Sequence, residues 1–405
     1  MVKSVKQRII SYEEFIYMPN IIFKSLGYDI LETPRPFWQK ILMRVYLAIC
    51  FCSHLYIVFY LFLRIIQWDT IRGNPSNFIR YAELFFLVLN SEIKIISFVY
   101  YRHRLQQLIF KLRDIYPVES CCKKYRVGDF YWSRTAIYGF RYFFFSVLTV
   151  LFSPLLQSVL VYFYQYFKIR NEAQFPYLRA YAMQLSFETK SPLNYALAQL
   201  LEFTCTHFIM NFNMGTDVWM MSLSALICMH FAYLGQQLEQ YKPSRYQERE
   251  DCAYLSNIVR KHRHLLGMHK ELNNIFGMLV AYNLFTTASI LCCVAYYTMV
   301  QGFNLGGVSY LMYFVSCSAQ FYAVCHFSQL LIDLSENLAK SAYSQTWYDG
   351  SIAYRKQLLF FILKTQKPVY LTAHGVIIIS RDTFKILMKI TYNAFALMSR
   401  VIEND

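Results

Sequence analysis

The sequence predicts an all-α, polytopic membrane protein with seven transmembrane helices, a cytoplasmic N-terminus, an extracellular C-terminus and a cytoplasmic helical anchor region. Three observations predict this fold class. Hydrophobic residues make up 56% of the 405 residues and charged residues only 16%, whereas soluble domains carry about 25% charged residues. The apolar residues form long blocks, and Leu272–Ile332 contains no Lys, Arg, Asp or Glu. Basic residues are concentrated between the blocks.

A helix needs ~20 apolar residues to cross the hydrocarbon core, and each of the first three apolar blocks is about that long or longer. Val45–Leu63 contains no charged residue, Tyr81–Tyr101 contains a few, and Tyr142–Phe167 has Pro154 near its middle, which predicts a kink. The seven predicted spans are 42–66, 79–101, 138–166, 193–236, 273–300, 307–332 and 381–402, and they belong to one membrane domain over residues 1–405.

The later blocks differ in length and polarity. Leu193–Leu238 is too long for one perpendicular span, so it is predicted to be a single helix that projects beyond the bilayer. The next two spans form a hairpin that turns at Gln301–Gly307. The last span carries Lys385 and Lys389, so we expect it to face protein or water instead of lipid.

The distribution of Lys and Arg sets the orientation. The predicted anchor region comprises 239–271 and 333–379 and includes an amphipathic helix over Ser351–Lys367. Lys and Arg are denser in these segments and in 1–41 and 102–135 than in 67–79, 168–192 and 301–309. Because cytoplasmic segments carry the excess of basic residues, the N-terminus is predicted to be cytoplasmic. An odd number of spans then leaves the C-terminus outside.

Ionisable residues inside the predicted spans need partners. Glu83, Glu92, Lys94, Glu202 and Asp217 fall within spans, and a charged side chain facing lipid would cost about 2.5–3.5 kcal/mol. We therefore expect these residues to pair between helices or to lie near a helix end. A transporter would use such residues for ions, but the sequence has no broken-helix pair or inverted repeat.

Several function classes lack sequence support. The net charge of +15 does not form a basic stripe typical of nucleic-acid binding. No phosphate-binding loop, Gly-x-Ser-x-Gly or His-Glu-x-x-His motif occurs, so no enzyme and no cofactor are predicted. His262, His264 and His269 lie near only one acidic residue and no cysteine, so a solvated helix is favoured over a metal site. The motifs of G-protein-coupled receptors are also missing.

A series of short motifs fills the C-terminal part of the chain. Ala-Tyr-x-x-x-Trp-Tyr occurs at Ala342–Tyr348 and is followed by Gln366–Pro368, Leu371–Gly375, Ser380–Phe384 and Thr391–Tyr392. In order and spacing this set resembles the insect odorant receptor family. The resemblance is dense from Ala342 onward and covers the rest of the chain at lower density.

The resemblance implies an odorant-gated, non-selective cation channel subunit that binds volatile ligands. Such subunits form a heterotetramer with the odorant receptor co-receptor in the plasma membrane of olfactory neuron dendrites. The segment Glu239–Glu271 is shorter than the corresponding loop of the co-receptor, so this chain looks like a ligand-specific tuning subunit. A gustatory receptor of the same superfamily, working without that co-receptor, is the alternative.

The resemblance also implies roles for residues outside the ligand pocket. Trp347, Tyr348 and Asp349 would lie in the subunit anchor, although they could simply cap a helix end. The final helix would line the pore, with Thr391, Phe395, Met398 and Ser399 on one face at the constriction. The family often has Gln where Met398 stands, which weakens the expected contribution to ion permeation. Packing on neighbouring helices is the alternative for this face.

The ligand pocket that the resemblance implies lies between helices two, three, four, five and six, in the outer half of the membrane. The residues expected at that depth are Tyr81, Phe85, Phe152, Leu156, Phe203, Met210, Tyr310, Tyr313 and Phe314. Aromatic and Met walls suit small volatile apolar molecules, because area burial and dispersion are weakly directional. Tyr310, Tyr313 or Asn211 could add a hydrogen bond, and plain helix packing is the alternative for each residue.

Overall fold

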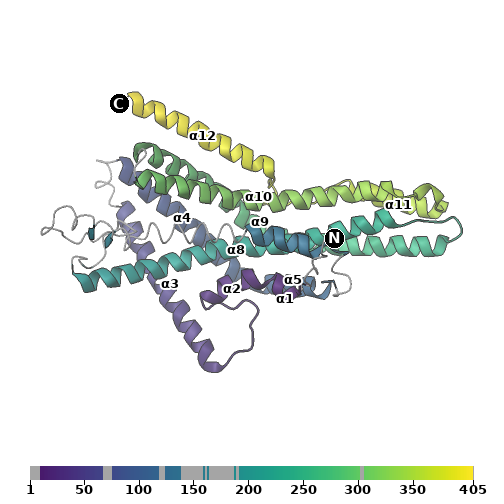
Figure 1. Ribbon diagram of the computed structural model, residues 1–405, viewed down its shortest axis with the longest axis horizontal. Coiled ribbons are helices and arrows are strands. Elements are labelled where there is room, and N and C mark those ends of the chain that lie inside the picture. The colour runs from purple at the N-terminus through teal and green to yellow at the C-terminus, as the bar shows by residue number, and fades with distance from the viewer. Residues whose placement is uncertain are drawn as a thin grey trace, which may run out of the picture.

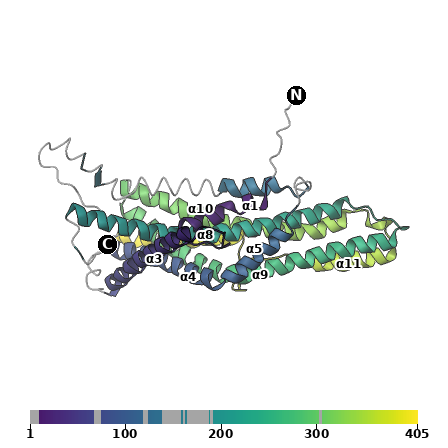
Figure 2. The same ribbon diagram turned by 90° about the horizontal axis from the view of Figure 1, so that it is seen from below.

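The computed structural model describes residues 10–66, 75–117, 124–137, 158–159, 162–163, 187, 191–301 and 305–404. Three long helices dominate this part of the chain: α8 (Pro192–Gln240), α9 (Glu248–Gln301) and α10 (Leu305–Ser344). They pack side by side along the long axis of the molecule, as Figures 1 and 2 show from two directions.

Shorter helices surround this group. The N-terminal elements are α1 (Tyr12–Phe15), α2 (Tyr17–Ser25), α3 (Phe37–Ile66), α4 (Pro75–Tyr100) and α5 (Arg102–Asp114), and residues 127–137 are also helical. The C-terminal elements are the 3₁₀ turn η3 (Trp347–Asp349), α11 (Ile352–Thr365), β1 (Thr372–Ala373), β2 (Ile377–Ile378) and α12 (Arg381–Asn404). Figure 1 shows α11 at the end of the molecule opposite to the C-terminus.

Helix α8 lies at the centre of the packing. Its start is fixed by Ser191, whose hydroxyl accepts the backbone N–H of Asn194, and by Pro192 at the first helical position. Farther along, Trp219 and Phe231 lie on different sides of the helix and both are fully buried. A helix that is apolar all round must be covered on every side, and α3, α4, α9 and α10 all pack against α8.

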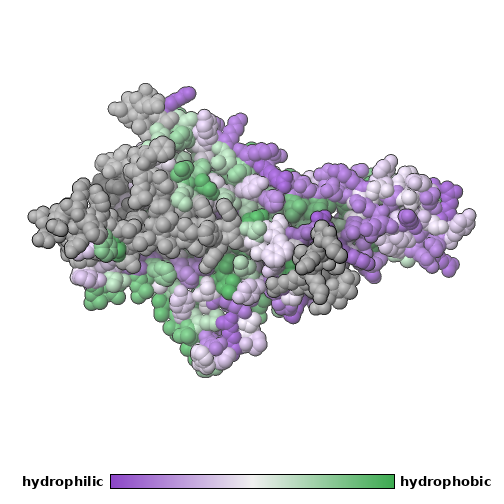
Figure 3. Space-filling view, in the orientation of Figure 1, coloured by the Kyte–Doolittle hydropathy of each residue, from purple (hydrophilic) through white to green (hydrophobic). Residues whose placement is uncertain are grey.

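Three of the described helices are long and apolar enough to cross a membrane, within Phe37–Leu63, Pro192–Gln240 and Glu248–Met299. Only 28% of the apolar window in α3 is buried, against 89% in α8. Helix α3 therefore presents its apolar side chains outward, as a lipid-facing helix does. Hydrophilic residues instead cover the end formed by α11 and the adjoining ends of α8, α9 and α10 (Figure 3).

The structure differs from the sequence-based expectation in α9 and α10. Residues 239–271 and 273–300 were expected to be an anchor segment and a separate span, whereas α9 runs unbroken from Glu248 to Gln301. Its sequence contains no proline to end the helix between the two parts. Likewise, α10 continues from the predicted span 307–332 to Ser344. Helix α8 is a single helix, as the sequence predicts.

A small β-hairpin, absent from the sequence-based expectation, precedes α12. Thr372 pairs with Ile378 and Ala373 with Ile377, and the turn contains His374 and Gly375 with positive φ angles of 51° and 75°. The hairpin is tied to α9, because Asn273 Oδ1 accepts the N–H of Thr372 at 2.8 Å. Gly277 permits this approach, since a Cβ there would lie 2.8 Å from the Thr372 carbonyl oxygen.

The third predicted span, 138–166, lies outside the described residues except for 158–159 and 162–163. The N-terminal helices α1 and α2 were not predicted. They are held by aromatic packing, since Phe23 stacks on Phe98 of α4 with ring centroids 4.5 Å apart. The buried guanidinium of Arg134 also lies 4.1 Å from the ring centroid of Phe15.

Candidate ligand-binding site

A cavity of about 40 Å³ lies where α4, α8, α9 and α10 meet. Its lining combines apolar side chains with several amides and hydroxyls. The lining residues are Leu87, Asn90, Met210, Asn213, Met214, Asn283, Thr287, Ile290, Tyr313, Ser316, Cys317 and Gln320. Each of the four helices thus contributes residues to the cavity.

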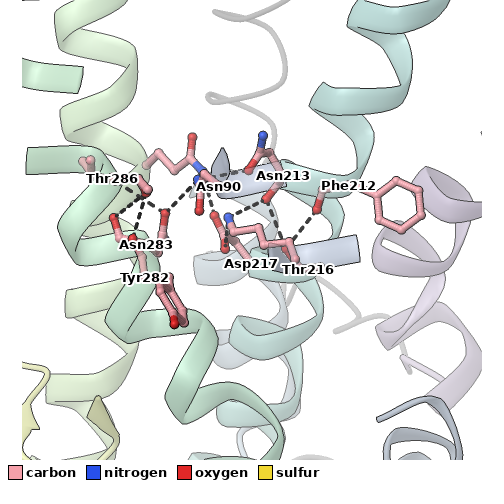
Figure 4. Close-up of polar contacts among 11 residues, drawn as sticks. Asn90, Phe212, Asn213, Thr216, Asp217, Tyr282, Asn283 and Thr286 are labelled. Atoms are coloured by element: carbon pink, nitrogen blue, oxygen red, sulfur yellow. Dashed lines mark hydrogen bonds and ion pairs between the residues drawn. The ribbon is translucent and has the colours of Figure 1, made fainter. Parts of the chain in front are cut away.

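Three asparagines from three helices connect the cavity walls. Asn90 Nδ2 donates to Asn213 Oδ1 at 3.0 Å and to Asn283 Oδ1 at 3.3 Å (Figure 4). Thr287 supports Asn283, because its hydroxyl donates to the same Oδ1 at 3.4 Å. All three asparagines are at most 5% exposed. Since a buried amide left without a partner costs about 1–3 kcal/mol, these bonds fix how α4, α8 and α9 are rotated.

A buried ion pair lies beside the asparagines. Lys94 Nζ is 2.8 Å from Asp217 Oδ1 and also donates to the backbone carbonyl of Asn213 at 3.1 Å. The second carboxylate oxygen of Asp217 accepts from Gln320 Nε2 at 2.7 Å. The expectation that ionisable residues in the spans pair between helices is confirmed for Lys94 and Asp217. It is also confirmed for Glu92, whose Oε1 lies 2.5 Å from His54 Nε2.

This arrangement gives the cavity two chemical sides. Leu87, Met210, Met214 and Ile290 supply apolar surface, while the amide cluster and Gln320 supply polar groups. Such a combination is typical of a small-molecule site, in which apolar contacts provide affinity and a few fixed polar groups provide orientation. The chemistry of the lining, though not its present volume, suits a compact, mainly apolar molecule.

The structure places the predicted pocket residues in several different environments. Met210 and Tyr313 line the cavity. Tyr81 belongs to a separate cluster with Ile57 and Ile209, and Tyr310 packs on Tyr297 with ring centroids 4.1 Å apart. Phe314 packs partly buried against the main core. Phe152 and Leu156 lie outside the described residues.

Like Tyr81, Tyr310 and Phe314, the predicted pocket residues Phe85 and Phe203 do not line the cavity. Phe85 is 40% exposed and lies about 200° round α4 from the cavity residue Leu87. Phe203 is 62% exposed and lies on the same face of α8 as Met210, but about 10 Å farther along the helix. Asn211 uses its Nδ2 within α8, where it donates to the His207 carbonyl at 2.7 Å. Membrane depth alone did not account for helix rotation or for the short length of the cavity.

The sequence-based reasoning missed the three asparagines. Only charged residues inside the spans were expected to pair between helices, and Asn211 was the one amide expected near the pocket. A signal was nevertheless present, because Asn90, Asn213 and Asn283 each lie within an apolar block. Amides in a membrane-spanning helix usually bond across to another helix.

The predicted pore residues differ in how deeply they are buried. Thr391 is 3% exposed and donates to the Leu387 carbonyl at 3.0 Å, and α12 packs against α9. It therefore packs within the subunit. Phe395 is half-buried, and the side chains of Met398 and Ser399 lie outside the described residues. The opposite face of α12 is exposed and includes Ile386, Ile390, Tyr392 and Leu397.

The predicted anchor residues form a turn between α10 and α11. Trp347 packs half-buried against the main core, whereas Tyr348 is 55% exposed and Asp349 is exposed. Arg355 fixes the turn because its Nη2 donates to the Tyr348 carbonyl at 2.8 Å. Ser351 caps α11 by accepting the N–H of Tyr354.

The sequence favours a solvated helix for the three histidines in the predicted anchor segment of α9. The structure shows instead that two of them are buried. His264 is exposed, but His262 and His269 are 6% and 8% exposed. Burial lowers the pKa of both buried histidines to about 4, so they are neutral near pH 7. His269 Nε2 lies 2.9 Å from the Tyr370 carbonyl. Within the described ranges, no three His, Cys, Asp or Glu side chains are grouped to hold a metal.

The long apolar helices and their packing define a class, the helical membrane proteins. The chain belongs to the insect odorant receptor family, because the family profile described as 7tm Odorant receptor matches residues 74–392. The resemblance found in the C-terminal motifs is thereby confirmed, and with it the expectation of a receptor instead of an enzyme.

The similarity to individual relatives extends over nearly the whole chain. It is 42% identical to Odorant receptor 49a of Drosophila melanogaster over 398 residues, which cover 98% of this chain and all of that protein. It is 33% identical to Odorant receptor 85f of the same species over 97% of this chain and 98% of that protein. These relatives are receptors other than the co-receptor, as the short segment 239–271 predicts.

The fold matches a solved structure of the insect olfactory receptor OR5 from Machilis hrabei in complex with eugenol. The TM-score is 0.73 at 16% sequence identity, covering 96% of this chain and 98% of that one. The predicted fold class, an all-α membrane protein of a seven-helix family, is confirmed.

Proposed function

We propose that this receptor is the ligand-specific subunit of an odorant-gated, non-selective cation channel that works with the odorant receptor co-receptor. The supporting observation is the cavity at the junction of α4, α8, α9 and α10, with its apolar walls and buried amides. We place the protein in the plasma membrane of sensory neuron dendrites. With a cytoplasmic N-terminus, the hydrophilic end seen in Figure 3 lies in the cytoplasm.

The proposed ligand is a small volatile molecule bound in this cavity. The structure of the relative from Machilis hrabei contains eugenol, which supports a small organic ligand for this chain as well. A volume of about 40 Å³ is far below the roughly 300–1,000 Å³ of pockets that enclose drug-sized ligands. Binding therefore requires side chains to move, and Met210 and Met214 are unbranched and adaptable enough to do so.

The proposed ion pathway runs along α12. A ring of apolar side chains contributed by several subunits can gate a pore by excluding water. Phe395 is our candidate for this ring, with Met398 and Ser399 beside it, because Phe395 is only half-buried within its own subunit. The burial of Thr391 in a helix that packs against α9 supports a packing role for that residue instead.

The proposed subunit contact lies at the turn between α10 and α11. Tyr348 is 55% exposed and the neighbouring Tyr343 is 66% exposed, next to the exposed carboxylate of Asp349. Exposed tyrosines with polar groups beside them are typical of interface anchors. Trp347 packs against the main core beside these two tyrosines and supports their position. We infer that this surface contacts the partner subunits of a heterotetramer.

Co-expression tests the proposal. In oocytes, the receptor together with the co-receptor is expected to give odorant-evoked, non-selective cation currents, whereas the receptor alone gives little current. The control is the co-receptor alone with the same odorant panel. Large currents from this chain without the co-receptor would contradict the proposal and favour the way in which gustatory receptors work.

The orientation is tested separately. An epitope tag at the N-terminus is expected to be labelled only after the cells are permeabilised, and a tag at the C-terminus to be labelled on intact cells. An N-terminal tag labelled on intact cells would overturn the proposed topology.

A further inference from the structure

A second cavity lies apart from the proposed ligand site, at the start of α3. It has a volume of about 420 Å³ and lies between the turn that follows α2 and the first turns of α3. Gly27 holds the two together: its φ is +82°, and a Cβ there would lie 2.3 Å from the carbonyl oxygen of Met43. The turn can therefore approach α3 closely only with glycine at this position.

The cavity carries a net positive charge. Four basic residues line it, Arg35, Lys40, Arg44 and Arg102, together with the acidic residues Asp29 and Glu32. Both acidic residues already have basic partners. Arg102 Nη2 lies 2.6 Å from Glu32 Oε1, and Arg35 Nε lies 3.9 Å from Asp29 Oδ2.

Lys40 and Arg44 are left without an acidic partner among the described residues. They stand one turn apart on α3 and both are exposed. The first turn of α3 contains no acidic residue that could neutralise them. An anion entering the cavity would therefore meet two uncompensated positive charges, with Arg102 held in place beside them by Glu32 and by the ring of Tyr28, 5.5 Å away.

The side of α3 next to the cavity is apolar and exposed. Phe37 and Ile41 lie within about 100° of the two basic residues round the helix and are 80% and 46% exposed, and Trp38 in the same turn is 63% exposed. They begin the apolar stretch Phe37–Leu63, most of which is not buried within the protein. Trp at the end of an apolar helix is typical of the membrane–water boundary, so the cavity opens where lipid headgroups lie.

We propose that this cavity binds the phosphate-bearing headgroup of an anionic lipid of the cytoplasmic leaflet. The acyl chains would lie along the exposed apolar side of α3, and Lys40 and Arg44 would pair with the phosphate. Basic pockets at the cytoplasmic ends of membrane helices bind anionic headgroups in this way. The choice of leaflet rests on the proposed topology, which the tag experiment tests independently of lipid binding.

The test uses the purified full-length receptor in nanodiscs of phosphatidylcholine. Binding of a fluorescent short-chain phosphoinositide is measured by anisotropy for the wild type, for Lys40→Gln/Arg44→Gln and for Lys356→Gln/Lys367→Gln. The last variant removes two exposed basic residues, Lys356 in α11 and Lys367 just after it, and is the matched control. Each basic residue near an anionic headgroup contributes about fivefold in affinity. We expect the Lys40/Arg44 variant to bind about thirtyfold more weakly and the control to bind like the wild type.

Two further arms complete the test. Lys40→Arg/Arg44→Lys retains both charges and is expected to retain binding, which shows that the site and not a folding defect is measured. Inorganic phosphate and the soluble headgroup should compete only weakly, because they lack acyl chains. The proposal is overturned if both double Gln variants lose affinity equally, if no variant differs from the wild type, or if the soluble headgroup binds as tightly as the lipid.

Discussion

The buried ion pair between Lys94 and Asp217 allows a quantitative test of the packing around the candidate ligand cavity. Asp217→Asn keeps the size of the side chain but leaves the ammonium of Lys94, which is 1% exposed, without its counter-charge. Removing one partner of a buried ion pair destabilises a protein by about 3–5 kcal/mol. The matched control is Asp382→Asn, in a pair of similar length (2.9 Å) whose side chains are 77% exposed. Exposed pairs contribute about 0–1 kcal/mol.

The assay is thermal unfolding of the solubilised receptor, followed by the monodisperse fraction in size-exclusion chromatography. Asp217→Asn is expected to lower the melting temperature well below that of Asp382→Asn. The double variant Lys94→Gln/Asp217→Asn should recover most of the loss, because both buried charges are gone and the amides can still hydrogen-bond. The ion pair does not stabilise the junction as argued if Asp217→Asn and Asp382→Asn have the same melting temperature. The same conclusion follows if the double variant is no more stable than Asp217→Asn.

Three further predictions concern the cavity, the pore and the anchor. Tyr313→Ala, in the cavity wall, is expected to weaken odorant potency about tenfold or more, whereas exposed Phe203→Ala should leave dose–response curves unchanged. Phe395→Ala is expected to alter basal current with the rank order of odorants retained; a reordered preference would contradict its place in the pore. Lowering the pH from about 7.5 to about 5.5 is expected to destabilise the receptor by about 1.4 kcal/mol through His269, because burial lowers its pKa to about 4 and only the unfolded chain binds the proton below about pH 6.5. His269→Gln retains a donor for the Tyr370 carbonyl and should reduce this pH dependence in thermal unfolding by the His269 contribution, while the buried His262 keeps its own.

The order and type of the helices could be predicted from the sequence because a membrane span leaves a strong compositional signal. The segment Leu272–Ile332, free of charged residues, contains most of the α9–α10 hairpin, and Ser351–Lys367 contains α11. The junction between anchor and membrane segments could not be predicted in the same way. A change of polarity along α9 marks where the environment changes, but it does not mark a break in the helix.

The candidate site was predictable only in part, because it depends on how the helices are rotated against each other. Met210 and Tyr313 were identified from their depth, since both lie in apolar blocks at the expected level. Asn90, Asn213 and Asn283 come from three helices, and no spacing within one helix shows that they meet. Their meeting is a property of the tertiary packing of α4, α8 and α9.

The unbroken course of α9 has a mechanical consequence. Asn283 in the cavity wall and Asn273 at the hairpin lie ten residues apart on this one helix, a distance of about 15 Å along its axis. Because a helix without proline resists sharp bending, this stretch acts as a rigid lever. If a ligand occupies the cavity as proposed and displaces its wall, Thr372 would move with α9, because its N–H is bonded to Asn273. The β-hairpin leads from Thr372 into α12, so the displacement would reach the helix that we propose lines the pore.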